Sequence, residues 1–293
     1  MHYRNMLSQK QVCIVGLGLM GGSLALALRG QVGRLTAVDT HAATRQQALQ
    51  QNLVEAVTAD FATGARQADL IIFATPVRTI LHLLSQLPEI RPDGCLVMDM
   101  GSTKAGICAA MGKLPEQFEA IGGHPMCGKE TAGLAAAVAD LYREQTFILC
   151  RNERSASQIE SLAQEVIAAV GAKVMWLLPE EHDRLVAAVS HLPYLVAATL
   201  MHTATSLEDE RVWPVSASGF RDTSRLAGSD PYMMRDILLT NRAAVLEQLA
   251  QYQTHLQAVT ELLESADEMS LAAWLQEKQA ERQMYLRCKD GNP

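Results

Sequence analysis

A histidine in the stretch IGGHPMCGKETAG, residues 121–133, is the first candidate for proton-transfer chemistry. Gly122 and Gly123 precede His124 and Pro125 follows it, which predicts a loop rather than a helix or the middle of a sheet. An imidazole with a pKa near 6.5 can take a proton from a substrate close to neutral pH. Because a single loop histidine is more often structural than catalytic, its partners must decide the role.

Three further segments carry residues suited to recognising a small polar substrate. MDMGSTKAGI contains Ser102, SHLPYL contains His191, and GFRDTSRLAGSDPYMMRDI contains Arg221 and Arg225. A serine hydroxyl can hydrogen-bond a substrate hydroxyl, and the planar fork of arginine matches a carboxylate. These arginines lie in an acidic part of the sequence. Residues 179–293 contain 10 Lys and Arg and 17 Asp and Glu, whereas residues 1–178 contain 15 of each. Taken singly, each of these residues is more often structural.

The segment VCIVGLGLMG has the glycine spacing of a dinucleotide-binding turn. Gly16, Gly18 and Gly21 form G-x-G-x-x-G after an apolar strand and at the start of an apolar helix. The glycines permit the tight turn, the approach to a pyrophosphate and the close packing of helix on strand, and the helix N-terminus offers N–H groups to the anion. Asp39 ends the next apolar run, where a carboxylate binds ribose hydroxyls and repels a 2′-phosphate. The motif therefore predicts NAD rather than NADP.

A third apolar strand ends in ATPV, and strand ends of this kind line the cofactor cleft of doubly wound sheets. Thr75 and Pro76 are therefore candidates for the cleft, although an ordinary strand-to-helix turn explains them equally well. The residues expected to contact the cofactor are Gly16, Leu17, Gly18, Leu19, Met20, Gly21, Asp39, Thr75 and Pro76.

Short apolar runs alternate with helical patterns through the first part of the chain, which predicts an α/β fold with a parallel, doubly wound sheet. The expected strands are residues 12–18, 34–39, 68–75, 95–100, 118–125, 146–150 and 173–178. Helical patterns lie between several of them, at 23–30, 43–53, 77–87 and 155–171.

From Pro179 onward the pattern is helical, because apolar residues recur at helical spacing up to Leu200. Pro193 lies inside this helix and is expected to kink it. A loop is expected over residues 208–231, followed by two amphipathic helices over 232–265 and 270–286.

Composition narrows the class of protein further. The net charge of −7 disfavours nucleic acid and anionic membranes as partners, since both require a basic surface. The six cysteines form no C-x-x-C pair, so we expect reduced thiols and no metal site. The N-terminus is too polar for a signal peptide, and no apolar run is expected to reach the ~18 residues of a membrane span. These features predict a cytoplasmic protein.

Five motifs in order, GLGLMGGSLALAL, DMGSTK, GGHPMCGKE, SHLPYL and GFRDTSRLAGSDPYMMRDI, resemble the prephenate/arogenate dehydrogenase family of tyrosine biosynthesis. The resemblance covers about residues 10–265. It implies an NAD-binding Rossmann domain over residues 1–178 and an all-α C-terminal domain over 179–293 that forms a homodimer. Because the sequence on either side of the resemblance is too short for a mutase or a regulatory domain, we expect the monofunctional form.

The resemblance implies a reaction in which prephenate loses a hydride to NAD+ and its ring carboxylate as CO2, giving 4-hydroxyphenylpyruvate. His124 would accept the proton of the ring hydroxyl, and Ser102 would hydrogen-bond the same hydroxyl. Arg225 would bind a substrate carboxylate, and His191 would lie on the substrate side of the first C-terminal helix.

Further residues are assigned to the substrate by the same resemblance. Glu130 and Asp183 match acidic residues near the mouth of the cleft that pair with the binding arginine, and Arg221 lies beside the site. Tyr194 departs from some relatives, which leaves the choice between prephenate and arogenate open.

Two other classes of protein share the glycine motif. β-Hydroxyacid dehydrogenases usually rely on a lysine of the helical domain, and residues 179–270 contain none. A non-catalytic NAD-binding regulator would keep the glycines and Asp39 but would not need Ser102, His124 and Arg225 in order.

Overall fold

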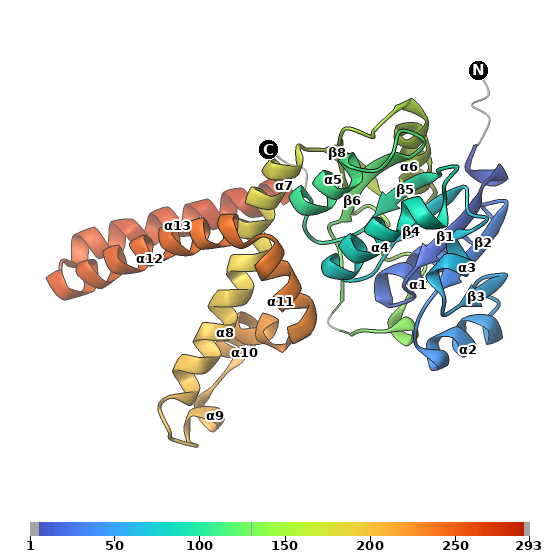
Figure 1. Cartoon of the computed structure of the whole chain (residues 1–293). Coiled ribbons are helices and arrows are strands. Elements are labelled where there is room, and N and C mark those ends of the chain that lie inside the picture. Colours follow the sequence, from blue (N-terminus) through green and yellow to red (C-terminus); the bar gives the residue numbers. More distant parts are fainter. Residues whose placement is uncertain (1–5, 130, 290–293) are drawn as a thin grey trace. The chain divides into compact units, whose positions relative to one another are not determined.

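The computed structural model describes residues 6–129 and 131–289. Within them, eight strands form one sheet in the order β3-β2-β1-β4-β5-β6-β7-β8 (Figure 1). The strands are β1 (Gln11–Val15), β2 (Arg34–Val38), β3 (Ala56–Thr58), β4 (Leu70–Phe73), β5 (Leu96–Asp99), β6 (Glu119–Pro125), β7 (Thr146–Cys150) and β8 (Lys173–Trp176). Every predicted strand is present, and the short edge strand β3 was not predicted.

The sheet is parallel except at one junction, where β6 and β7 run antiparallel. The order of the first strands reverses between β1 and β4, so their carboxyl ends flank the crevice where doubly wound sheets bind ligands. The predicted α/β Rossmann-type fold is therefore confirmed, with the β6–β7 pair as a departure from an all-parallel sheet.

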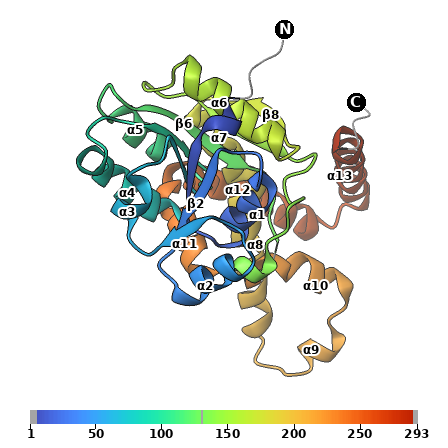
Figure 2. The same cartoon turned by 90° about the vertical axis from the view of Figure 1, so that its right-hand side faces the viewer.

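Two apolar layers cover the sheet because strand residues alternate between its faces. In β1, Val12 and Ile14 join one buried cluster with α1 and α6, while Cys13 and Val15 join the other with α3, α4 and α5. Figure 2 shows the helices on both sides of the sheet. The helices are α1 (Leu19–Leu28), α2 (Ala42–Gln50), α3 (Phe61–Ala65), α4 (Val77–Ile90), α5 (Ala105–Gly112) and α6 (Ser157–Ala169).

The remainder of the described chain is helical, as predicted, but more finely divided. The elements are α7 (Pro179–Val186), a π-helical turn (Ala187–His191), α8 (Leu192–Thr205), α9 (Val212–Val215), α10 (Ser218–Ser224), a 3-10 turn (Arg225–Gly228), α11 (Pro231–Thr240), α12 (Arg242–Ser265) and α13 (Glu268–Lys289). The prediction of a loop over 208–231 was wrong, since α9 and α10 lie there. The single helix predicted over 232–265 is instead interrupted at Asn241, the C-cap of α11.

Pro193 is accommodated by a change of helical pitch. It occupies the first turn of α8, directly after the π-helical turn, where the backbone N–H of Leu192 donates to the carbonyl of Ala187, five residues back. A π-helical turn absorbs an extra residue in an otherwise continuous helix, and such turns often occur at functional sites. The helix therefore continues past the proline with His191 at the altered turn.

Helix Pro179–Thr205 also corrects an expectation about membranes. It is 27 residues long and contains an 18-residue window with a mean hydropathy of 1.4, so by length and composition it could span a bilayer, and only 22 % of that window is buried. One such helix is weak evidence for a membrane span, because the core helix of a soluble protein passes the same test.

Packing divides the chain into two compact units, residues 1–245 and 246–293. The first contains the sheet together with α7 to α11. The second contains α13 and most of α12. Val245 is the one buried residue of α12, and α13 has none among its described residues.

Candidate active site

The glycine loop has the geometry of a nucleotide cradle. Gly16 has a φ of 96°, a conformation that favours glycine, and its N–H donates to the Val38 carbonyl at 2.7 Å. A Cβ on Gly21 would lie 1.9 Å from the Gly16 carbonyl oxygen, so α1 packs directly on the turn. A Cβ on Gly18 would meet nothing within 4 Å, and no side chain caps the first turn of α1. The loop therefore presents open space and free N–H groups where a pyrophosphate binds.

Asp39 follows β2 and faces this loop. Its carboxylate accepts hydrogen bonds from the Leu17 N–H at 2.9 Å and the His41 N–H at 2.8 Å. The Leu17 side chain is buried in the core, so only its backbone borders the turn, while Leu19 and Met20 are half-buried in the first turn of α1. The carboxylate thus ties the second strand to the glycine turn at the position of the ribose-binding acid.

Thr75 and Pro76 follow β4 on the other side of the crevice. The Thr75 methyl carbon would lie 2.8 Å from a Cβ on Gly16, and Pro76 is exposed. The Thr75 hydroxyl is buried without a hydrogen-bond partner in the described part of the chain. A buried, unpaired hydroxyl costs about 1–3 kcal/mol, which a ligand at this position would relieve. The residues present therefore fit a dinucleotide.

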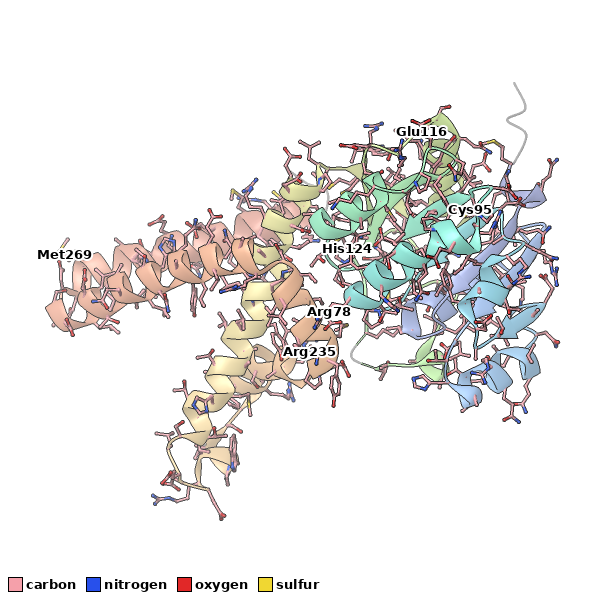
Figure 3. The ribbon with its side chains drawn as sticks, viewed as in Figure 1. Arg78, Cys95, Glu116, His124, Arg235 and Met269 are labelled. Atoms are coloured by element: carbon pink, nitrogen blue, oxygen red, sulfur yellow. The ribbon has the colours of Figure 1, made fainter. Side chains whose placement is uncertain are left out.

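His124 lies in strand β6, so the strand predicted over 118–125 is confirmed and the loop predicted from the neighbouring glycines and proline was wrong. It pairs with Ile148 of β7. Figure 3 labels His124 within the sheet domain. Gly122 and Gly123 serve close packing rather than flexibility, because a Cβ on Gly123 would lie 2.4 Å from the Asp99 carbonyl oxygen. The strand can therefore run on past β5 and place the imidazole at the edge of the sheet.

A hydrogen-bonded chain of side chains leads from His124 into helix α7. His124 Nδ1 lies 2.8 Å from His182 Nε2, and His182 Nδ1 lies 2.8 Å from Asp183 Oδ1. His182 is fully buried and Asp183 is 4 % exposed. The candidate base is thus backed by a second histidine and a buried carboxylate.

Asp183 does not lie at the mouth of a cleft, which corrects the role expected from the resemblance. Its carboxylate accepts the backbone N–H groups of Lys104 at 2.7 Å and Ala105 at 3.0 Å, at the start of α5. Both oxygens are used in this way, because α7 packs against the N-terminus of α5. Asp183 therefore supports the site from behind.

A second buried carboxylate, Asp99, holds the same turn from the other side. It forms a salt bridge with Lys104 in which both side chains are fully buried. It also accepts the N–H of Gly101 at 2.7 Å and the N–H of Gly123 at 2.9 Å. Asp99 thus joins the neighbours of Ser102 and His124 through one side chain.

His191 is 1 % exposed and lies 3.2 Å from Asn241 through its Nδ1. The same Asn241 amide donates to the Asp183 carbonyl at 2.7 Å. Asn241, the C-cap of α11, therefore connects that helix to His191 in the π-helical turn and to Asp183 in α7.

Burial sets the electrostatics of the three histidines. Burial, followed by the nearby charges of His182, Lys104 and His191, holds the pKa of His124 well below 6.5. Burial also lowers the pKa of His182, against the opposing effect of its bond to Asp183, and lowers the pKa of His191 to about 4. Burial by itself would raise the pKa of Asp183, but its bonds from His182, Lys104 and Ala105 outweigh it and the pKa is lowered. The site therefore combines neutral imidazoles with an ionised carboxylate.

The other predicted site residues lie as follows. Ser102 is half-buried in the turn between β5 and α5, and Tyr194 is half-buried in the first turn of α8. Arg225 is exposed at the start of its 3-10 turn, which packs against α8. Arg221 is exposed in α10 and pairs with Asp222 at 3.1 Å. Glu130 lies outside the described residues.

Sequence reasoning missed His182, Asp99, Lys104 and Asn241. The dipeptide His182–Asp183 in PEEHDRL was a usable signal, since an adjacent histidine and carboxylate on a helix start are a plausible relay. Asp99 and Asn241 gave no local signal, because their partners are distant in the sequence.

The sheet is doubly wound and carries a dinucleotide cradle at its carboxyl edge. His124 lies at the same edge and is linked through His182 to the Asp183 carboxylate. These features are typical of a nucleotide-dependent dehydrogenase. Two family models match the chain: the prephenate dehydrogenase nucleotide-binding domain over residues 24–176 and the prephenate dehydrogenase dimerization domain over 178–277. The chain belongs to the prephenate dehydrogenase family.

Individual relatives agree with this membership. Prephenate dehydrogenase of Bacillus subtilis is 31 % identical, over 89 % of this chain and 72 % of the relative. Cyclohexadienyl dehydrogenase of Zymomonas mobilis is 29 % identical, over 93 % and 95 %. The crystal structure of prephenate dehydrogenase from Aquifex aeolicus, in complex with hydroxyphenyl propionate and NAD+, superposes with a TM-score of 0.89 at 30 % identity, covering 95 % of this chain and 99 % of that one.

Proposed function

We propose that this chain is an NAD-dependent prephenate dehydrogenase, which converts prephenate to 4-hydroxyphenylpyruvate and CO2 in tyrosine biosynthesis. The observation that carries the proposal is the buried Asp183–His182–His124 chain, which ends at the same sheet edge as the glycine cradle. Membership of the family supplies the reaction class, and the A. aeolicus relative was solved with NAD+.

Bound NAD+ would supply the hydride acceptor for the hydroxyl-bearing ring carbon. In our proposal His124 takes the hydroxyl proton, and Ser102 hydrogen-bonds the same hydroxyl from the turn after β5. A neutral imidazole is required for this step, which agrees with the lowered pKa of His124. The ring carboxylate then leaves as CO2, its bonding electrons make the ring aromatic, and the resulting phenolate oxygen takes the proton back from His124. Aromatisation makes the overall reaction favourable.

We propose that Arg225 binds a substrate carboxylate, with Arg221 and Tyr194 near the side-chain end of the substrate. Both arginines are exposed and lie in elements next to α8, so they are accessible to an anionic ligand. Glu130 stays a candidate for the cleft mouth on the resemblance alone. His191 is buried against Asn241, so we propose that it shapes the pocket.

Arogenate dehydrogenase activity is the second candidate, alone or combined with prephenate oxidation. The similar Zymomonas mobilis protein is a cyclohexadienyl dehydrogenase, at nearly the same identity as the Bacillus relative. Ring chemistry is common to both substrates, so the difference lies in recognition of a keto or an amino group.

We further propose a functional boundary at residues 178/179 and a homodimer formed through the C-terminal helices. In support, the first family model ends at residue 176 and the second, named for dimerization, begins at residue 178. Among the described residues, all but four of the exposed large apolar side chains follow residue 178. The exposed apolar side chains of α12 and α13 suit contact with a second copy, and we propose a cytoplasmic enzyme that binds neither membrane nor nucleic acid.

The deciding experiment measures NADH or NADPH formation by the purified protein, with prephenate and arogenate offered in parallel and NAD+ or NADP+ with each. Turnover of prephenate with NAD+ is the expected result. Turnover of arogenate alone would reassign the substrate. Binding of NAD+ without turnover of either compound would favour a non-catalytic regulator.

A further inference from the structure

We propose that His182 and Asp183 are positioning residues that hold His124 with its ring proton on Nδ1, so that Nε2 is the bare nitrogen facing the substrate. The proposal deepens the proposed function, because the use of Nε2 as a base depends on that function. The proton arrangement itself depends only on the three side chains and can be measured without substrate.

The direction of each hydrogen bond follows from Asp183. An ionised carboxylate can only accept, and Asp183 accepts the Lys104 and Ala105 N–H groups as well as the bond from His182. The positive end of the α5 helix dipole lies at these N–H groups and favours the anion. His182 Nδ1 must therefore carry a proton and donate it.

The proton on His182 Nδ1 determines the direction of the hydrogen bond between His182 and His124. A neutral His182 with its proton on Nδ1 has a bare Nε2, which can only accept. His124 Nδ1 lies 2.8 Å from this atom and must donate to it. A neutral His124 with its proton on Nδ1 has a bare Nε2, which is the form that can take a proton from a hydroxyl.

The competing arrangement requires a charged His182 that donates from both nitrogens. His124 Nδ1 would then be the acceptor and Nε2 would carry the proton, so the base would be blocked. His182 is fully buried, and burial lowers its pKa despite Asp183. The neutral arrangement is therefore the one present at neutral pH.

The carboxylate also stabilises the product of proton transfer. When His124 Nε2 takes the substrate proton, the ring becomes an imidazolium that still donates from Nδ1 to His182. Asp183 keeps its negative charge one imidazole away, and Lys104 is already neutralised by Asp99. The arrangement follows the logic of a serine protease triad, with a second imidazole between base and carboxylate.

The same groups hold the distance between the base and the serine turn. Asp183 binds the Lys104 and Ala105 N–H groups, and Asp99 binds the N–H groups of Gly101 and Gly123. A closed network of hydrogen bonds therefore links the turn of Ser102 to α7, α7 to His124, and the neighbour of His124 back to the same turn. A change in His182 should act on orientation as well as on the tautomer.

The test compares His182→Gln with His182→Leu. Glutamine can accept from His124 Nδ1 through its oxygen and donate to Asp183 through its amide, so it reproduces both bonds in the same direction. Leucine fills the apolar volume and makes neither bond. We expect His182→Gln to keep kcat within about tenfold of wild type, and His182→Leu to lower it by about 10²–10⁴-fold, with the KM for NAD+ unchanged in both. If His182 served only to fill space, His182→Leu would keep a higher kcat than His182→Gln.

Nitrogen NMR of protein labelled with ¹⁵N-histidine reads the tautomer directly, and loss of signals in His124→Asn assigns the ring. The expected wild-type spectrum has a protonated Nδ1 and a bare Nε2 at pH 7. A protonated Nε2 would overturn the proposal whether or not the variants fold. The matched control, His202→Leu, changes an exposed histidine of α8 and should keep both tautomer and rate.

The two proposals fail separately. If the protein oxidises neither prephenate nor arogenate but His124 carries its proton on Nδ1, the proposed function is wrong and the proposed role of His182 and Asp183 stands. If the protein oxidises prephenate but His124 carries its proton on Nε2, the proposed role of His182 and Asp183 is wrong and the proposed function stands. The same conclusion follows if His182→Leu oxidises prephenate at the wild-type rate.

Discussion

His124 takes its chemical character from side chains that lie far from it in the sequence. Its nearest partner, His182, is 58 positions away, and the carboxylate behind that partner also caps helix α5. Burial of the pair makes the neutral form of each ring the stable one. At the scale of single residues, the site is a neutral base held by an anion rather than an isolated imidazole.

Replacement of His124 by asparagine should lower kcat by about 10²–10⁴-fold, because general base catalysis typically contributes that much. The glycine cradle does not involve His124, so NAD+ binding should be unchanged. Steady-state kinetics and NAD+ titration by calorimetry test this pair of outcomes. Normal turnover by the variant would rule out His124 as the base.

The acid side of the kcat/KM profile should reflect the lowered pKa of His124. Burial lowers this pKa most, and the charged and titratable groups near the ring, His182 from α7, Lys104 from the turn after β5 and His191 from the π-helical turn, lower it further. The free enzyme should therefore keep a neutral base below pH 6.5, and kcat/KM should decline only at lower pH. A decline centred at or above pH 6.5 would contradict this environment.

At the scale of elements, the carboxyl ends of β1, β2, β4, β5 and β6 present the candidate groups along one edge. The β5–β6 ladder ends at Met98 and Ile121, and the Asp99 side chain then takes the place of a backbone acceptor for Gly123. Strand β6 continues beyond this point and pairs with β7. The two ladders therefore meet between Ile121 and Gly122, just before Gly123 and His124.

Gly123→Ala should disturb this junction. The new methyl group would lie 2.4 Å from the Asp99 carbonyl oxygen, so the backbone must shift, and overpacking of this kind typically costs about 1–3 kcal/mol. Lower kcat and a lower urea midpoint are expected. Gly106→Ala in α5 is the matched control, since its Cβ meets nothing within 4 Å. Equal behaviour of the two variants would show that the junction is not tightly packed.

Lys104→Met should destabilise the fold by about 3–5 kcal/mol, because it leaves the fully buried Asp99 carboxylate without its counter-charge. Urea unfolding at pH 7 measures the change. Lys113→Met, in the C-cap of α5, is the surface control and should alter the free energy of unfolding by less than about 0.5 kcal/mol. A small effect at Lys104 would mean that water reaches the pair.

At the scale of the whole molecule, the buried His182 and His191 and the half-buried His124 link folding to pH. The folded chain keeps His124, His182 and His191 neutral below pH 6.5, whereas the unfolded chain protonates them. Their contribution to stability is therefore complete above pH 6.5 and is lost as the pH falls toward the folded pKa, about 4 for His191.

The free energy of unfolding should consequently fall below pH 6.5, with a slope approaching about 1.4 kcal/mol per pH unit for each histidine. Urea midpoints at pH 7.5, 6.5 and 5.5 measure the slope. His191→Gln should reduce it and the exposed-site variant His202→Gln should not. Constant stability down to pH 5 would contradict the burial of these rings.

Local sequence was sufficient for the parts of this protein that depend on short-range geometry. Gly16, Gly18, Gly21 and Asp39 lie within two strands and one helix, so spacing alone predicts the cradle. Seven of the eight strands also followed from local apolar patterns, whereas the short strand β3 and the helices α9 and α10 did not. His124 and Ser102 were found because the motifs that contain them are contiguous.

Long-range packing was required for everything that gives His124 its partners. The bonds His124–His182, Asp183–Lys104 and Asn241–His191 join residues 50 to 79 positions apart, and no local pattern encodes which side chains meet. The antiparallel β6–β7 pair and the break at Asn241 have the same origin, since both depend on contacts that form only when the chain has folded back. Backbone preference acts over a few residues, whereas hydrogen-bond partners of buried side chains are chosen by the three-dimensional fold.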